Sequence, residues 1–188
     1  MKYLKNNKIF MFMFVFSIIS FILGIFFYYL IGDNNQELIT SNINLLFNNK
    51  LVNYSDLFLN NILITSIIYI LGISVIGIII ILPIYLFKVF ILSFEFTSLI
   101  INLKFHNIFV ILLYLIPNII NIIIYYIICY YAVSYSIFLI KNIYFNKSYN
   151  MFKISNKYLF IYLISLVFII LSSFLEIFIL PRLKLFII

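Results

Sequence analysis

The hydrophobic positions of this chain fall into long uninterrupted runs, and short segments between them hold most of the polar residues. A helix of roughly 20 apolar residues crosses a hydrocarbon core about 30 Å thick. Runs near or above this length extend over residues 9–31, 62–87, 89–103, 107–140 and 158–180. This pattern predicts an all-α, multi-spanning helical membrane protein. We expect about five transmembrane helices in a single integral membrane domain, residues 1–188.

Residues 89–116 are open to two interpretations. The run 89–103 is short for a span, and Lys104 and His106 separate it from the run that contains Pro117. In one interpretation it is a short third span, followed by one long kinked span. In the other, residues 89–116 enter the membrane and return as two half-helices, and Pro117 begins the true span. Such broken helices are tolerated only where protein covers them or where they line a cavity.

The distribution of basic residues favours five spans. Four lysines between residues 141 and 157 form the densest basic loop, and cytoplasmic loops are enriched in Lys and Arg. With five spans, that loop shares a side with the N-terminal tail 1–8, and Lys88 closes the second run on the same side. We therefore expect a cytoplasmic N-terminal tail at 1–8, an outer segment at 32–61 and a cytoplasmic loop at 141–157.

The outer segment is the one long polar stretch of the chain, and its apolar residues recur at helical spacing. They are Leu38, Ile39, Ile43, Leu46 and Phe47. This spacing predicts an amphipathic helix. Such a helix lies on the outer membrane surface, on a partner, or on the protein's own bundle, and the pattern does not distinguish these positions.

Composition excludes a soluble globular enzyme. Hydrophobic residues make up 66% of the chain and charged residues 9%, and the mean hydropathy is +1.25; soluble domains are about 25% charged. A net charge of +7 suggests nucleic acid in a soluble protein. Here most basic residues lie in short segments beside apolar runs, so we interpret them as membrane-orienting charges and expect no nucleic-acid partner.

The chain carries no recognisable catalytic constellation. It lacks a phosphate-binding G-x-x-x-x-G-K-[ST] loop, an H-E-x-x-H zinc pair and a G-x-S-x-G nucleophile elbow. With one His and one Cys, it offers no metal site, and we expect no cofactor and no enzymatic activity. Cys129 is interpreted as a buried small side chain, and the tyrosines between residues 125 and 135 as an aromatic belt at the membrane interface.

The candidate structural or partner-contact residues lie within the apolar runs. Small residues let helices approach closely in lipid, and ionisable residues at membrane depth usually face the bundle interior or a cavity. Each polar candidate has two interpretations. For Glu95 and Glu176 we favour pairing with a basic residue, which for Glu176 includes Arg182 and Lys184 near the helix end, over an interhelical, ion or partner site. For Asn118 and Asn121 we favour a hydrogen bond between helices over a contact site. The candidates are Gly72, Gly77, Lys88, Glu95, Pro117, Asn118, Asn121, Glu176 and Pro181.

The order of four segments resembles the stage II sporulation protein M family of bacterial membrane proteins. These segments are SDLFLNNILIT, YILGISVIGIIIILPIYLFKVFILSFEF, LLYLIPNIINIII and LEIFILPRL. The residues that fit the family pattern are Asn61, Gly72, Gly77, Pro83, Lys88, Phe90, Phe94, Pro117, Asn118, Glu176 and Pro181. Val89 and Ser93 replace two family glycines, which puts close helix packing there in question, and Glu95 lies outside the pattern.

The resemblance implies a role that no single residue reveals. It implies a non-catalytic scaffold in the bacterial cytoplasmic membrane that localises two cell-wall hydrolases, the sporulation proteins P and D, on the outer side during engulfment. The expected partners are then the lipid bilayer, these murein hydrolases, and further copies or other subunits in a homo- or hetero-oligomer. The alternative is a membrane subunit of a transporter or channel in a non-sporulating bacterium, with a hydrated path lined by Glu95, Asn118, Asn121 and Glu176.

Overall fold

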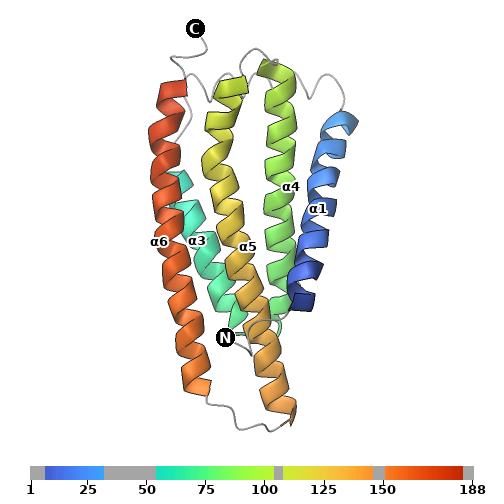
Figure 1. The fold of residues 1–188 in the computed structure, drawn as a ribbon, viewed down its shortest axis with the longest axis vertical. Helices are drawn as coiled ribbons and strands as arrows, with labels where there is room; N and C mark the ends of the chain where they lie inside the picture. Colours follow the sequence, from blue (N-terminus) through green and yellow to red (C-terminus); the bar gives the residue numbers. More distant parts are fainter. Residues whose placement is uncertain (1–6, 32–53, 104–107, 146–150, 184–188) are drawn as a thin grey trace.

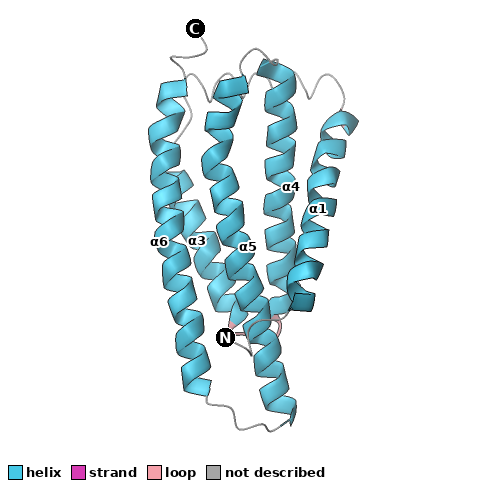
Figure 2. Cartoon of the chain, viewed as in Figure 1, coloured by secondary structure: helices cyan, strands magenta, loops and turns pink. Residues whose placement is uncertain are grey.

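A computed structural model describes residues 7–31, 54–103, 108–145 and 151–183. Every regular element within these ranges is a helix (Figures 1 and 2). The helices are α1 (Asn7–Leu30), α3 (Tyr54–Gly72), α4 (Gly77–Leu103), α5 (Ile108–Phe145) and α6 (Met151–Leu183). The expected all-α architecture with five helices is therefore confirmed for the described part of the chain.

Successive helices run in alternating directions, so that α1, α4 and α6 ascend in the view of Figure 1 while α3 and α5 descend. α4 packs between α1 and α5, and α6 packs against the other side of α5. α3 lies behind this row and contacts α4, α5 and α6. As a result, α5 touches every other helix, and its side chains form the centre of the bundle.

Four helices are long and apolar enough to cross a membrane. These segments are Lys8–Leu30, Gly77–Ile101, Ile111–Asn142 and Met151–Ile179, and α3 adds the shorter apolar stretch Phe58–Gly72. The outer faces are covered with large apolar side chains; on α1, for example, Phe26 is 58% exposed. A soluble monomer rarely exposes so large an apolar surface, whereas lipid covers it in a multi-pass membrane protein.

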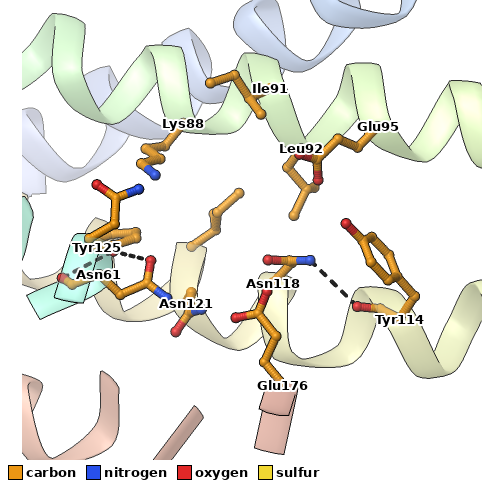
Figure 3. Close-up of a pocket in the computed structure, with 12 residues that line it drawn as sticks. Asn61, Lys88, Ile91, Leu92, Glu95, Tyr114, Asn118, Asn121, Tyr125 and Glu176 are labelled. Atoms are coloured by element: carbon orange, nitrogen blue, oxygen red, sulfur yellow. Dashed lines mark hydrogen bonds between the residues drawn. The ribbon is translucent and has the colours of Figure 1, made fainter. Parts of the chain in front are cut away.

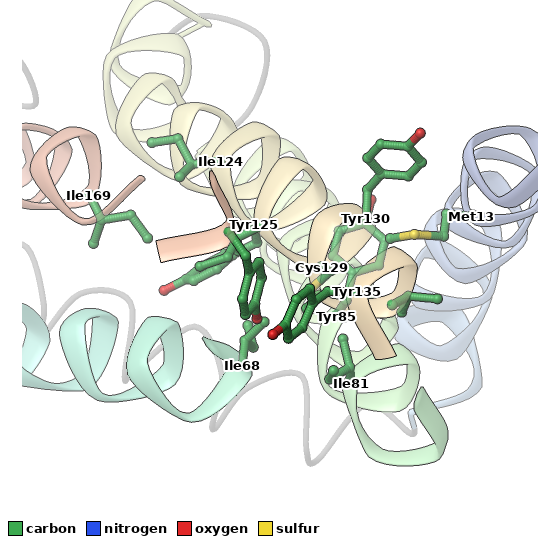
Figure 4. Packing of buried hydrophobic residues seen from close by; sticks show 14 of the residues in the cluster. Met13, Ile68, Ile81, Tyr85, Ile124, Tyr125, Cys129, Tyr130, Tyr135 and Ile169 are labelled. Carbon is green, nitrogen blue, oxygen red and sulfur yellow. The ribbon is translucent and has the colours of Figure 1, made fainter. Parts of the chain in front are cut away.

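The interior holds a continuous apolar cluster to which every described helix contributes (Figure 4). Met13, Ile68, Ile81, Ile128 and Ile169 are each at most 1% exposed. The predicted aromatic belt is wrong for Tyr125, Tyr130 and Tyr135, which are 2%, 7% and 6% exposed and belong to this cluster. Their position on the central helix explains the burial, because α5 has neighbours on several sides.

The predicted span 62–87 is wrong, because the chain turns at residues 73–76 between α3 and α4. The hydroxyl of Ser136 on α5 donates a shared hydrogen bond to the carbonyl oxygens of Gly72 (2.8 Å) and Ser74 (2.9 Å). Three of the four turn residues are Ile or Val, so hydropathy does not reveal the turn. Instead, a side chain from another helix pairs the backbone carbonyl groups at the end of α3.

This turn also corrects the two interpretations of residues 89–116. Residues 89–103 are neither a separate span nor half of a re-entrant pair, because they continue α4 from Gly77 to Leu103. Lys88 accordingly lies near the middle of α4 rather than at an inner loop. Pro117 lies within α5 and does not begin it. The loop 141–157 is shorter than expected, since α5 ends at Phe145 and α6 begins at Met151.

The outer segment 32–61 is only partly described. Its last residues, from Tyr54 onward, form the start of α3. The expected amphipathic helix with Leu38 and Phe47 lies outside the described residues.

Candidate functional site

Polar side chains from four helices surround a cavity of about 210 Å³ in the half of the bundle where α3 begins and α6 ends (Figure 3). α4 and α5 form most of the wall, while α3 and α6 contribute Asn60, Asn61 and Glu176. The lining residues are Asn60, Asn61, Lys88, Ile91, Leu92, Glu95, Tyr114, Asn118, Asn121, Ile122, Tyr125 and Glu176. A cavity of this polarity is unusual in a bundle whose other interior contacts are mainly apolar.

Helical periodicity explains why these residues meet. Lys88 and Glu95 are seven residues apart on α4, which is close to two turns of 3.6 residues, so both face α5. On α5, Tyr114, Asn118 and Asn121 repeat at spacings of four and three residues, which places them on one face. The two helices therefore turn their polar faces toward each other across the cavity.

Asn61 joins three helices at one end of the cavity. Its amide oxygen accepts a hydrogen bond of 3.1 Å from the hydroxyl of Tyr125 on α5, and its amide nitrogen donates one of 3.2 Å to Ser173 on α6. Asn61 is 9% exposed, so both bonds lie inside the bundle. This residue positions α3 against its two neighbours.

Pro117 lies beside the cavity and connects α5 to α6. It is almost fully buried, and its carbonyl oxygen accepts a hydrogen bond of 3.0 Å from Ser172. The amide nitrogen of the next residue, Asn118, donates a long hydrogen bond of 3.5 Å to the carbonyl oxygen of Tyr114, one turn earlier on α5 (Figure 3). The Pro–Asn island of the sequence thus forms part of the cavity wall.

Three ionisable side chains share the cavity: Lys88, Glu95 and Glu176. The ammonium nitrogen of Lys88 lies 6.0 Å from the centroid of the Tyr125 ring, and this cation interacts electrostatically with both carboxylates. The carboxylates also interact with each other.

The sequence-derived candidates divide into two groups in space. Lys88, Glu95, Asn118, Asn121 and Glu176 line the cavity, with Pro117 next to it. The remaining candidates lie elsewhere: Gly72 and Gly77 flank the turn between α3 and α4, and Pro181 is in the last turn of α6. The structure adds Asn60, Asn61, Tyr114 and Tyr125. Of these four residues, Asn61 was indicated by the sequence, because it fits the family pattern.

Gly72 allows a close approach of three helices. A Cβ atom there would lie 2.9 Å from Cβ of Ala132 on α5 and would collide with the hydroxyl of Tyr158 on α6. The Tyr158 ring stacks between Tyr69 and Tyr135, with centroid distances of 4.9 and 4.6 Å. These contacts give Gly72 a packing role.

The cavity provides binding groups rather than a recognisable reaction centre. Its side chains offer carboxylate, amide and phenol oxygens with one ammonium group. Within the described residues, no group of three or more His, Cys, Asp or Glu side chains could hold a metal ion. The arrangement is suited to binding a small polar species, or to passing one between the helices.

Comparison with known proteins identifies one family. The model of a family described as Stage II sporulation protein M matches residues 6–181, from the start of the first helix to the last turn of α6. No curated protein and no solved structure matches the chain.

Proposed function

The chain belongs to the Stage II sporulation protein M family, and from this membership we propose that it is a non-catalytic scaffold in the bacterial cytoplasmic membrane. In this role it anchors and localises cell-wall hydrolases, the sporulation proteins P and D, during engulfment. The observation that carries the proposal is the extent of the family match, which includes all five described helices. A compact bundle with few polar side chains is suited to anchoring partner proteins in a membrane.

We further propose that the N-terminus is cytoplasmic. The start of α1, the end of α5 and the start of α6 lie at the same end of the bundle (Figure 1). Lys8, Lys141, Lys153 and Lys157 are exposed near this end. Basic residues that flank spans favour the cytoplasmic side, so this end faces the cytoplasm and residues 32–53 face outward.

The scaffold proposal assigns partner binding to the outer segment, from Asp33 to Asp56. Hydrolases that act on the cell wall work outside the membrane, so a contact on this side positions them at their substrate. The segment holds the apolar residues at helical spacing that an amphipathic partner helix requires.

Affinity purification from the native host tests the scaffold directly. The tagged protein is extracted in mild detergent, and co-purifying proteins are identified by mass spectrometry. We expect murein hydrolases with the unaltered chain, and their loss when residues 36–50 are replaced by a Gly/Ser linker. The matched control, Glu95→Gln with Glu176→Gln, should retain them. Absence of hydrolases from the unaltered protein, extracted from sporulating cells, contradicts the proposal.

A second candidate function is favoured by one observation, the cavity. A transporter or channel subunit requires polar residues together at membrane depth, and Glu95, Asn118, Asn121 and Glu176 line one space. This candidate predicts co-purification with an ATPase subunit or another permease. It also predicts solute flux in proteoliposomes that Glu95→Gln and Glu176→Gln abolish while hydrolase binding is unchanged. Flux that both variants retain removes the cavity from any transport role.

A further inference from the structure

Two helices of the bundle are too long to lie wholly within a bilayer. α5 has 38 residues and α6 has 33; at about 1.5 Å per residue they are about 57 and about 50 Å long. The hydrocarbon core is only about 30 Å thick. Figure 1 shows both helices continuing past the start of α1 and α4, at the end of the bundle where α5 finishes and α6 begins. Part of each helix therefore projects from the membrane at this end.

Two contacts with the last residue of α3 fix where the projecting part begins. On α5, the hydroxyl of Ser136 donates a hydrogen bond of 2.8 Å to the carbonyl oxygen of Gly72. On α6, the hydroxyl of Tyr158 lies against the same glycine. Residues 137–145 and 151–157 lie past this level, and we call them the α5–α6 extension. Its two arms are in contact, since the amide nitrogen of Asn142 donates a hydrogen bond of 3.0 Å to Sδ of Met151.

On α6, the lysines of the extension continue the face that meets lipid. Lys153 lies seven residues before Phe160, and Lys157 lies seven residues before Ile164, which is close to two helical turns in each case. Phe160 and Ile164 are 63% and 42% exposed on the outside of the bundle, and both lysines are exposed as well. The two lysines therefore lie at the end of a lipid-facing stripe, where hydrocarbon gives way to phosphate headgroups.

The charge of the extension has one sign. Lys141 on α5 is also exposed, and the sequence contains no Asp or Glu from residue 96 to residue 175. Lys153 and Lys157 are four residues apart, a spacing at which like charges on a helix repel each other. An anion bound between them removes this repulsion. Clusters of lysines directly outside a membrane span are typical of binding to anionic lipid headgroups.

Phe152 favours a lipid surface over an acidic protein as the occupant. Its side chain is 76% exposed, and it lies seven residues before Leu159, which is 45% exposed on the lipid-facing side. An aromatic ring beside basic residues at the end of a span is typical of the membrane interface. There the ring packs at the boundary between headgroups and acyl chains, whereas in water its apolar surface would stay hydrated.

We propose that the α5–α6 extension binds anionic phospholipid. The ammonium groups of Lys153 and Lys157 pair with the phosphate of the headgroup, and the ring of Phe152 packs beside it at the acyl boundary. Lys141 on the neighbouring arm adds to the positive potential. The extension thereby gives the protein a preference for membrane rich in anionic lipid. This inference depends neither on the scaffold role nor on the cavity, because the residues that carry it lie at the opposite end of the bundle.

A fluorescent reporter at position 152 tests the preference directly. The chain contains no Trp, so Phe152→Trp introduces a single reporter at an exposed position. The full-length variant is reconstituted in phosphatidylcholine vesicles that contain equal mole fractions of either brominated phosphatidylglycerol or brominated phosphatidylcholine, whose bromine atoms quench the reporter. We expect phosphatidylglycerol to bind about two- to fivefold more tightly. This preference should decrease at about 0.5 M NaCl, because salt screens the lysines.

The lysines are tested in the same reporter chain. Lys153→Gln with Lys157→Gln should remove the preference for phosphatidylglycerol. The matched control, Lys50→Gln with Lys104→Gln, removes the same charge outside the extension and should retain it. If the first pair alters the circular dichroism spectrum, the salt dependence of the reporter chain provides the comparison. Equal quenching by the two lipids at low salt overturns the proposal. Water-like emission that neither lipid quenches also overturns it, and then favours an acidic protein as the occupant.

Discussion

Gly24 on α1 lies directly against Ser93 on α4, at a distance that leaves no room for a side chain. A Cβ atom at position 24 would collide with the hydroxyl of Ser93 and would lie 2.5 Å from the carbonyl oxygen of Phe90. The sequence raised doubt about close packing at this point, because Ser93 replaces a family glycine. In the structure, Gly24 on the opposite helix provides the space that a glycine at position 93 would otherwise provide.

This contact predicts a strong effect of one methyl group. Gly24→Ala should destabilise the folded bundle by about 1–3 kcal/mol, the usual range for overpacking, because the obstacle includes the α4 backbone. Thermal unfolding in detergent measures the change. Leu23→Ala is the matched control: Leu23 is 53% exposed, faces outward and should alter the midpoint much less. Equal effects of the two variants would contradict the predicted contact.

The turn between α3 and α4 gives a second prediction, with a control on the same helix. Ser136→Ala removes the donor to the carbonyl oxygens of Gly72 and Ser74. We expect a loss of about 1–3 kcal/mol, because the buried carbonyl oxygen of Gly72 loses this donor, while the carbonyl oxygen of Ser74 still accepts from the backbone N–H of Gly77. Ser134 is also buried, but its hydroxyl has no hydrogen-bond partner among the described residues, so Ser134→Ala should be nearly neutral. Chemical or thermal unfolding of both variants decides between these outcomes.

The sequence could predict the helical class and the number of described helices, because both depend on the lengths of apolar runs. It could not locate the turn at residues 73–76. Its residues are as apolar as the helices beside it, and its stabilising donor, Ser136, is more than 60 residues away. Because the turn was missed, the sequence analysis placed Lys88 at the inner end of a span, whereas it lies near the middle of α4.

The candidate site was predictable in its residues but not in its geometry. An ionisable or amide side chain in an apolar run stands out in the sequence, which is how Glu95, Asn118 and Glu176 became candidates. Their meeting in one cavity depends on the relative rotation of α4, α5 and α6, and apolar periodicity in lipid says little about rotation. Tyr125 was missed because tyrosines are typical both of membrane interfaces and of buried polar contacts.

The connection made by Asn61 predicts a measurable coupling. Asn61→Ala and Tyr125→Phe each remove one partner of the 3.1 Å hydrogen bond, and their effects on unfolding should not add. Interhelical hydrogen bonds in membrane proteins contribute about 0.6 kcal/mol on average and up to about 1.7 kcal/mol, so we expect a coupling energy in this range. The matched cycle pairs Asn61→Ala with Ser134→Ala, where additivity is expected. A coupling of zero for Asn61 and Tyr125 would contradict the hydrogen bond.

The proposed orientation predicts which ends of the helices a membrane-impermeant maleimide reaches. Cys129 is buried and is the chain's one cysteine, so the unaltered protein should remain unlabelled in intact cells and serves as the control. Lys153→Cys, near the start of α6, should react only after the membrane is opened, because basic flanks favour the cytoplasm. Lys50→Cys, in the segment assigned to the outer side, should react in intact cells. The reverse pattern would place the N-terminus outside, and the hydrolase-binding role of residues 32–53 would then be untenable.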